Sequence, residues 1–181
     1  LTAKLGKYAV LGNHDYGKYY KWDSEEARLN NLEAVKNIYR NFDFDLLLNE
    51  NRVLARGEDT LVIAGMENCG EEPFPCYGDM DASLSGVEDK PVLLLSHDPS
   101  TWKTTILDYK NVLMTFSGHT HAGQIFPVEF FINVLKTADL SYGYKDVEGM
   151  DSVVSSGLVG WGFPIRTSRH SEYVVIDVKK R

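Results

Sequence analysis

The chain reads VLMTFSGHTH from Val112 to His121, an apolar run that ends in a glycine and a pair of histidines. Two more stretches have the same design, YAVLGNHD from Tyr8 to Asp15 and VLLLSHD from Val92 to Asp98. Short apolar runs predict buried strands, and open α/β sheets bind ligands beyond the carboxyl ends of their strands. The sequence therefore predicts an α/β fold in which three strand ends meet at one site.

The segments between these runs predict both helices and strands. A helix is expected from Asp23 or Ser24 to Tyr39, because Asp23 and Glu26 have the spacing of a capping box. Further strands are expected at residues 46–48, 52–56, 60–64, 152–155 and 173–178, a short helix at 101–109, and a long loop with one turn of helix at 67–86. Strands that first alternate with helices and then pair among themselves predict a sandwich of two sheets.

The bulk composition describes an ordinary globular protein of one domain, which we assign to residues 1–181. A net charge of −7 argues against nucleic acid as a partner, because phosphate backbones attract clustered Lys and Arg. No apolar run approaches the roughly 18 residues of a membrane span, and no signal peptide opens the chain. Because the chain begins at Leu1, we expect it to be a fragment of a longer protein.

The two cysteines, Cys69 and Cys76, lie in the loop-like stretch between residues 67 and 86. They could form a disulfide bond, and two free thiols are an equally good interpretation. The cellular compartment is therefore left open by the cysteines.

The three motifs carry side chains that can bind a metal. In extended backbone, His119 and His121 would point to the same side, and Asn13 is a poor strand residue at the end of an apolar run. Imidazole and amide ligands suit Mn, Fe or Zn better than Mg or Ca. A lone histidine such as His97 is usually structural, so the hypothesis depends on the combination of motifs. Asp15 could orient a neighbouring histidine or cap the local backbone.

These motifs resemble three of the motifs of the calcineurin-like metallophosphoesterase superfamily: Gly-Asn-His-Asp at residues 12–15, a lone histidine at His97, and Gly-His-x-His at 118–121. The flanking residues are similar to the YkuE-type bacterial phosphoesterase branch. The resemblance runs from about Leu5 to the C-terminus. It implies a sandwich of two mixed β-sheets flanked by helices, and hydrolysis of phosphoric esters by a binuclear-metal hydroxide nucleophile.

By this resemblance, Asn13, His97 and His119 would bind one metal, and His121 the other. His14 would be the catalytic histidine. Asp15 would assist it from beside the site. The resemblance implies two divalent ions, Mn, Fe or Zn, and a phosphodiesterase or phosphatase activity on a phosphate-ester substrate.

The family also has an Asp-x-His and a Gly-Asp-x-x-Asp motif before the Gly-Asn-His-Asp, and neither precedes Gly12 in this chain. We therefore expect an N-terminally truncated domain that lacks its first strands and the bridging carboxylate. Such a fragment would bind at most one metal, weakly, and would be inactive. Exposed sheet edges would favour self-association.

Two alternatives stay open: a non-catalytic scaffold with the same fold, and a mononuclear metal-binding protein. Peripheral membrane association of the parent, and a cytoplasmic or envelope-associated location in a bacterium, are expectations at the level of the family.

Two C-terminal segments carry weaker signals. Val128, Phe131, Ile132 and Leu135 share one helical face, which favours a core-packed helix over a substrate groove or a membrane-surface element. Residues 161–164 with Arg166 could wall a pocket and bind phosphate, or could form a packed surface loop. His170 lies outside every motif and is expected on an exposed loop.

Overall fold

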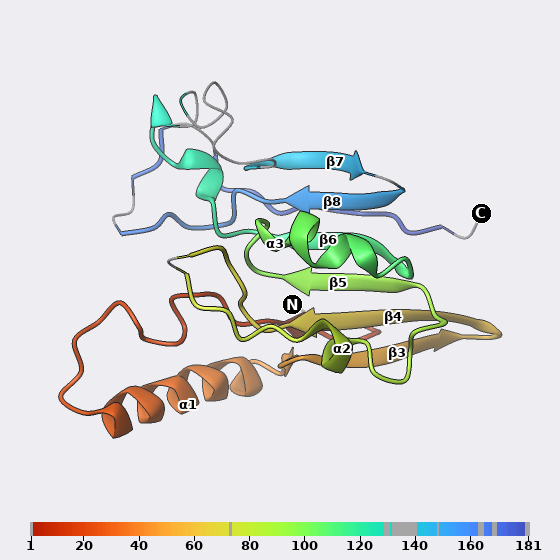
Figure 1. Cartoon of the computed structure of the whole chain (residues 1–181), viewed down its shortest axis with the longest axis horizontal. Coiled ribbons are helices and arrows are strands. Elements are labelled where there is room, and N and C mark those ends of the chain that lie inside the picture. The colour runs from red at the N-terminus through yellow and green to blue at the C-terminus, as the bar shows by residue number, and fades with distance from the viewer. Residues whose placement is uncertain are drawn as a thin grey trace.

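The computed structural model describes residues 2–72, 74–128, 131, 141–147, 149–162, 165–167 and 170–179. Its centre is a six-stranded mixed sheet (Figure 1). The sheet contains, in spatial order, β3 (Glu50–Arg56), β4 (Asp59–Met66), β5 (Val92–Ser96), β6 (Val112–Ser117), β8 (Met150–Val154) and β7 (Gly143–Val147). The expected α/β class is confirmed.

The four central strands, β4, β5, β6 and β8, are parallel, and β3 and β7 close the two sides in antiparallel pairing. Parallel strands have both faces covered, which explains why β5 is an unbroken apolar run before its final serine. Because β5 and β6 run in the same direction, their carboxyl ends meet at one edge of the sheet. The two histidine motifs that follow these strands are brought together there.

Short helices cover one face of the sheet. They are α2 (Met80–Ser83), α3 (Thr101–Thr104) and the 3-10 turn η1 (Ile106–Asp108). Trp102 of α3 is 2% exposed and packs in a core with Val62, Met66 and Leu94 of the sheet. Burial of each such side chain contributes about 1.5–3 kcal/mol, so this layer fixes the position of the strand ends.

A second, two-stranded parallel sheet lies on the opposite face. It pairs β1 (Tyr8–Ala9) with β2 (Asp45–Leu46). The two layers touch at Gly65 of β4, where a Cβ atom would lie 2.4 Å from the Cβ of Leu47 and 2.7 Å from the Cγ1 of Val10. Leu11 and Leu47 are fully buried. This layer carries the residues that follow β1 toward the edge where β5 and β6 end.

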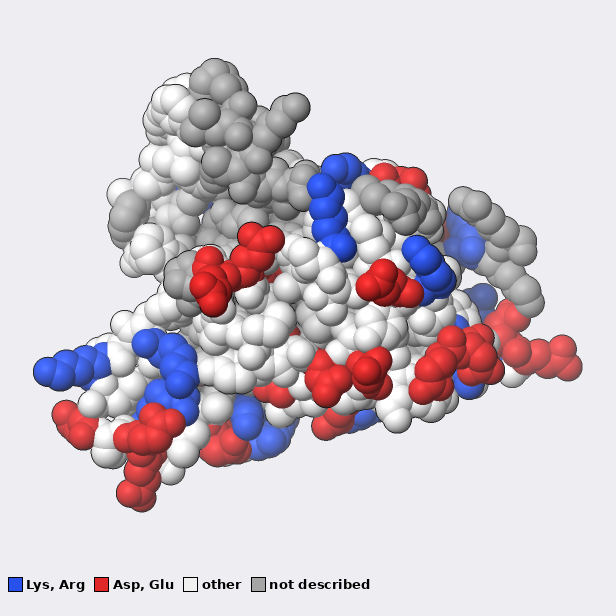
Figure 2. Space-filling view, viewed as in Figure 1, with Lys and Arg blue, Asp and Glu red and all other residues white. Residues whose placement is uncertain are grey.

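The helix α1 (Glu25–Asn41) begins at Ser24, whose Oγ accepts a hydrogen bond of 3.1 Å from the Ala27 N–H. The N-cap is therefore Ser24 and not the Asp23–Glu26 box. The helix has no buried residue, and acidic and basic side chains lie over it (Figure 2). Its charged face is a solvated surface, with ion pairs such as the one between Arg28 and Glu25.

The C-terminal part of the expected fold needs two corrections. Residues 173–178 form no strand, and Tyr173 and Val175 are 82% and 81% exposed. The sheet edge is occupied by β7, whose sequence GYKDV has no continuous apolar run of the kind that identified the other strands. The helix expected at 101–109 is divided between α3 and η1 at Thr105, whose φ of −133° and ψ of −48° are not helical.

The helix expected at residues 126–135 is present at its described residues Val128 and Phe131, but its expected core packing is wrong. Val128 and Phe131 are 46% and 54% exposed. Ile132 and Leu135 lie outside the described residues. Within the described part of the chain, no helix is both long and apolar enough to span a membrane.

Candidate metal centre

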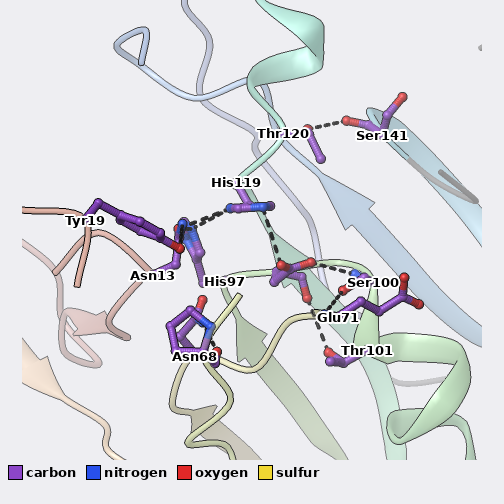
Figure 3. Close-up of polar contacts among 12 residues, drawn as sticks. Asn13, Tyr19, Asn68, Glu71, His97, Ser100, Thr101, His119, Thr120 and Ser141 are labelled. Atoms are coloured by element: carbon purple, nitrogen blue, oxygen red, sulfur yellow. Dashed lines mark hydrogen bonds and ion pairs between the residues drawn. The ribbon is translucent and has the colours of Figure 1, made fainter. Parts of the chain in front are cut away.

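The three motifs meet at the carboxyl edge of the sheet (Figure 3). His97 follows β5 directly, and His119 follows β6 after one intervening glycine. Asn13 arrives from the second layer, four residues after β1. Residues far apart in the sequence therefore form one cluster because the strands that carry them end together.

Three donor atoms in this cluster form a nearly equilateral triangle. Asn13 Oδ1 lies 3.1 Å from His97 Nε2 and 3.2 Å from His119 Nδ1, and the two imidazole nitrogens are 3.3 Å apart. Adjacent ligands of a metal with bonds of about 2.0–2.1 Å are separated by about 3.0–3.4 Å, so the triangle matches one face of a coordination polyhedron. The donor set fits a divalent cation of the Mn, Fe or Zn type.

Carboxylates do not complete this donor set. Among the described residues, no group of three or more His, Cys, Asp and Glu is arranged to hold a metal, and the triangle depends on the amide oxygen of Asn13. Desolvation in the cluster lowers the pKa of His97 to about 4, with smaller effects from the neighbouring histidines, and burial also lowers the pKa of His119. Both imidazoles are therefore neutral near pH 7 and can offer lone pairs.

Tyr19 holds the orientation of Asn13, and no pattern in the sequence pointed to it. Asn13 is 2% exposed, and its Nδ2 donates a hydrogen bond of 3.0 Å to the Tyr19 hydroxyl. With the amide nitrogen engaged there, Oδ1 faces the two histidines (Figure 3).

His121 does not join the triangle. The backbone turns through left-handed conformations at His119, His121 and Ala122, with φ of 67°, 51° and 52°, and again at Gln124 with φ of 48°. The expectation of an extended backbone from His119 to His121 is therefore wrong. His121 Nδ1 instead lies 3.2 Å from the Val159 carbonyl oxygen.

His14 lies beside the cluster in an aromatic setting. Trp161 Nε1–H donates a hydrogen bond of 2.9 Å to His14 Nε2, and the Tyr19 ring centroid is 4.7 Å from that of His14. The Asp15 carboxylate accepts a 2.8 Å hydrogen bond from the Gly12 N–H, and burial raises its pKa against the effect of this bond. Asp15 thus caps the local backbone, which is one of the two roles that the sequence left open.

The family description "Calcineurin-like phosphoesterase" matches residues 1–123 of the chain, which include all three motifs. The chain belongs to this family. A protein of Bos taurus named "Transmembrane protein with metallophosphoesterase domain" is 30% identical over 190 residues, covering 95% of this chain and 38% of that protein. Its namesake in Danio rerio is 27% identical over 187 residues, covering 99% of this chain and 40% of the relative.

A third relative, "UDP-2,3-diacylglucosamine pyrophosphatase LpxG" of Chlamydia trachomatis, is 27% identical over 211 residues, covering 89% of this chain and 60% of that protein. The relatives thus include eukaryotic as well as bacterial proteins. This calcineurin-like phosphoesterase chain spans about 40% of the length of the two vertebrate relatives. No solved structure matches the chain at a significant level.

An open pocket of about 800 Å³ lies over the donor triangle of this calcineurin-like phosphoesterase chain. Its walls include the aromatic side chains of Tyr19, Phe74 and Trp161 and the aliphatic side chains of Ile125 and Val128. Trp161 therefore walls the pocket as one sequence interpretation expected. Phe163 and Pro164 lie outside the described residues.

Arg166 packs within a loop, which was the alternative to a phosphate-binding role. Its guanidinium donates to the backbone carbonyls of His121, Ser156 and Val159 at 2.8–3.2 Å. These contacts hold the loop that carries Trp161 against the turn after β6. His170 is exposed, as expected.

A disulfide bond joins Cys69 and Cys76, which settles the pairing that the sequence left open. The loop that it closes places the Phe74 ring edge-on to the His119 ring, with centroids 4.8 Å apart and planes at 85°. The long 67–86 segment, predicted as a loop, thus shapes the site.

Proposed function

We propose that this chain is the metal-binding part of a metal-dependent phosphoric ester hydrolase of the YkuE-type branch, organised as one domain over residues 1–181. The observation that carries the proposal is the triangle of Asn13 Oδ1, His97 Nε2 and His119 Nδ1, with sides of 3.1–3.3 Å. These three residues would hold one divalent cation. We assign His121 to a second cation in the whole protein, where further ligands would be needed.

When bound, divalent cations at such a site neutralise charge on the phosphoryl oxygens and make water nucleophilic at neutral pH. The chain itself supplies the orientation of the donors. Tyr19 fixes the amide of Asn13, and Asp15 fixes the turn after Gly12 through its hydrogen bond to the Gly12 N–H. His14 would stabilise developing charge or protonate the leaving alkoxide, because imidazole exchanges protons near neutral pH.

The hydrogen bond from Trp161 assigns the proton of neutral His14 to Nδ1, since Nε2 is the acceptor. Trp161 would have to yield its place when His14 uses Nε2 toward a leaving group. We propose that the exposed Trp161 ring moves with substrate entry, because it walls the same pocket.

The pocket also favours a class of substrate. Its aromatic and aliphatic walls, together with the relative named for a diacylglucosamine nucleotide, favour a phosphoester or pyrophosphate with an apolar group beside the phosphorus. Membrane association and self-association through sheet edges stay predictions.

The proposal is tested by metal analysis and by hydrolysis of bis(p-nitrophenyl) phosphate with added Mn²⁺, on the 181-residue chain and on the whole protein. We expect one bound ion per 181-residue chain and none after His119→Ala. In the whole protein, His14→Asn should retain the metal and lose about 10²- to 10⁴-fold in kcat. A metal-loaded whole protein that is inactive on mono- and diesters would favour the scaffold alternative.

A mononuclear metal-binding protein is the second candidate, and the same triangle favours it. It predicts tight binding of one cation by the whole protein with no esterase activity. The stoichiometry measured on the whole protein separates the two candidates.

A further inference from the structure

Asp98 is a buried carboxylate that the proposed reaction does not use. It is 3% exposed, and among the described residues no lysine or arginine forms an ion pair with it. An unpaired carboxylate in the interior is costly, so its surroundings should show what it serves. The ionisable group placed beside it is the His119 imidazole, whose Nε2 lies 3.4 Å from Asp98 Oδ2.

The carboxylate itself is held firmly. Oδ1 accepts a 2.9 Å hydrogen bond from the Ser100 N–H, and the backbone oxygen accepts one from the Thr101 hydroxyl. Gly70 lies against the other oxygen so closely that a Cβ there would be 2.4 Å from Oδ2. The Asp98 side chain therefore has little freedom to turn away from His119.

The opposite edge of the His119 ring faces the donor triangle. Nδ1 lies 3.2 Å from Asn13 Oδ1 and 3.3 Å from His97 Nε2 (Figure 3). If the His119 proton were on Nδ1, Nδ1–H would donate a hydrogen bond to Asn13 Oδ1. Two of the three atoms of the triangle would then be engaged with each other and not available to a cation. A proton on Nε2 leaves the Nδ1 lone pair free for a cation. The position of this one proton decides whether the triangle is open or closed.

We propose that Asp98 is the positioning residue that holds the His119 proton on Nε2 and so keeps the donor triangle open. A cation on Nδ1 would withdraw electron density from the ring and make Nε2–H a stronger donor to the carboxylate, so binding and the Asp98 contact reinforce each other. The Phe74 ring, edge-on to His119, limits rotation of the imidazole about the same position. The inference rests on the proposed metal site but concerns this chain's own proton.

The first test needs no variant and no metal. Nitrogen-15 chemical shifts of the metal-free chain near neutral pH should identify His119 as the Nε2–H tautomer. An Nδ1–H tautomer in the wild-type chain would overturn the inference, whatever the chain does with metals.

The second test uses Asp98→Asn, which preserves the size of the side chain and removes its charge. Because an amide can also donate to Nε2, His119 should become a mixture of tautomers. Mn²⁺ affinity measured by calorimetry should fall roughly 10- to 100-fold. The matched control is Asp89→Asn, the same charge change at an exposed residue before β5, which should stay within about twofold.

The outcomes separate this inference from the proposed function. Equal Mn²⁺ affinity of wild type and Asp98→Asn would overturn the role of Asp98. Absence of Mn²⁺ binding to the wild type would overturn the metal site while the tautomer measurement still tests the role of Asp98. Should Asp98→Asn fail to fold, the wild-type tautomer decides.

Discussion

The substitution Gly12→Ala should damage the metal site through a single methyl group. A Cβ atom at Gly12 would lie 2.7 Å from Cε1 of His97 and 2.8 Å from each ring nitrogen. Ordinary contacts begin near 3.4 Å, so the ring must move by at least about 0.7 Å. Metal–ligand distances tolerate only about ±0.2 Å, and therefore His97 Nε2 would leave the triangle.

Two magnitudes follow from this displacement. Overpacking should lower the free energy of unfolding by about 1–3 kcal/mol. Mn²⁺ affinity should fall by at least about 10- to 100-fold, the size of effect seen when a residue that orients a metal ligand is lost. Urea unfolding of the metal-free chain gives the first quantity, and calorimetric titration of the folded chain gives the second.

Gly118→Ala is the matched control, because it adds the same methyl group to the other motif glycine. No heavy atom lies within 4 Å of a Cβ at Gly118, and its backbone is outside the left-handed region. The reasoning is refuted if both alanine variants behave alike, or if Gly12→Ala binds Mn²⁺ as the wild type does.

Three further predictions concern stability and tautomers. Replacing Cys69 and Cys76 by serine should lower the free energy of unfolding by about 2.5 kcal/mol in urea, the loop-closure entropy of this eight-residue ring, and dithiothreitol should have the same effect on the wild type. Burial lowers the pKa of His97 to about 4, so the unfolded chain binds a proton at this residue more readily than the folded chain does. The free energy of unfolding of the metal-free chain should therefore be at its full value above about pH 6.5. It should fall by up to about 3 kcal/mol as the pH falls toward 4. His97→Gln should flatten this dependence, and an unchanged slope in urea unfolding would contradict it. Trp161→Phe removes the donor to His14 Nε2, so nitrogen-15 shifts should change from one His14 tautomer to a mixture, whereas a single unchanged tautomer would show that the indole does not select it.

The apolar runs predicted the centre of the sheet well. β5 is buried along nearly its whole length, and β4 from Val62 onward is buried or half-buried, so hydrophobicity alone identifies these strands. β6 is identified by its apolar run although Leu113 is exposed. The edge strand β7 has a polar sequence and is defined by its pairing with β8, which no local pattern contains. The apolar residues 173–178 show the reverse error, because their sequence resembles a strand but no pairing forms.

The motifs located Asn13, His97 and His119 because each follows a strand that ends at the same edge. The residues that orient them were missed, since Tyr19 and Phe74 come from loops whose positions depend on the whole fold. Asp98 had a signal, its place directly after His97, but its contact with His119 depends on the turn after β6. That turn also separated His121 from the triangle, because left-handed backbone at non-glycine residues cannot be read from a His-x-His spacing.

The left-handed turn from His119 to Gln124 lowers the stability of the fold while it positions the His119 ring. Four non-glycine residues there have positive φ, and each costs on the order of 1 kcal/mol relative to a relaxed backbone. The free energy of unfolding of a native domain is only about 5–15 kcal/mol, so the cost of this turn is a large fraction of it. Selection for heat resistance alone would favour glycine at Ala122 and loosen the turn that aims His119. If related proteins keep the strained turn, the orientation of His119 has been selected more strongly than stability has.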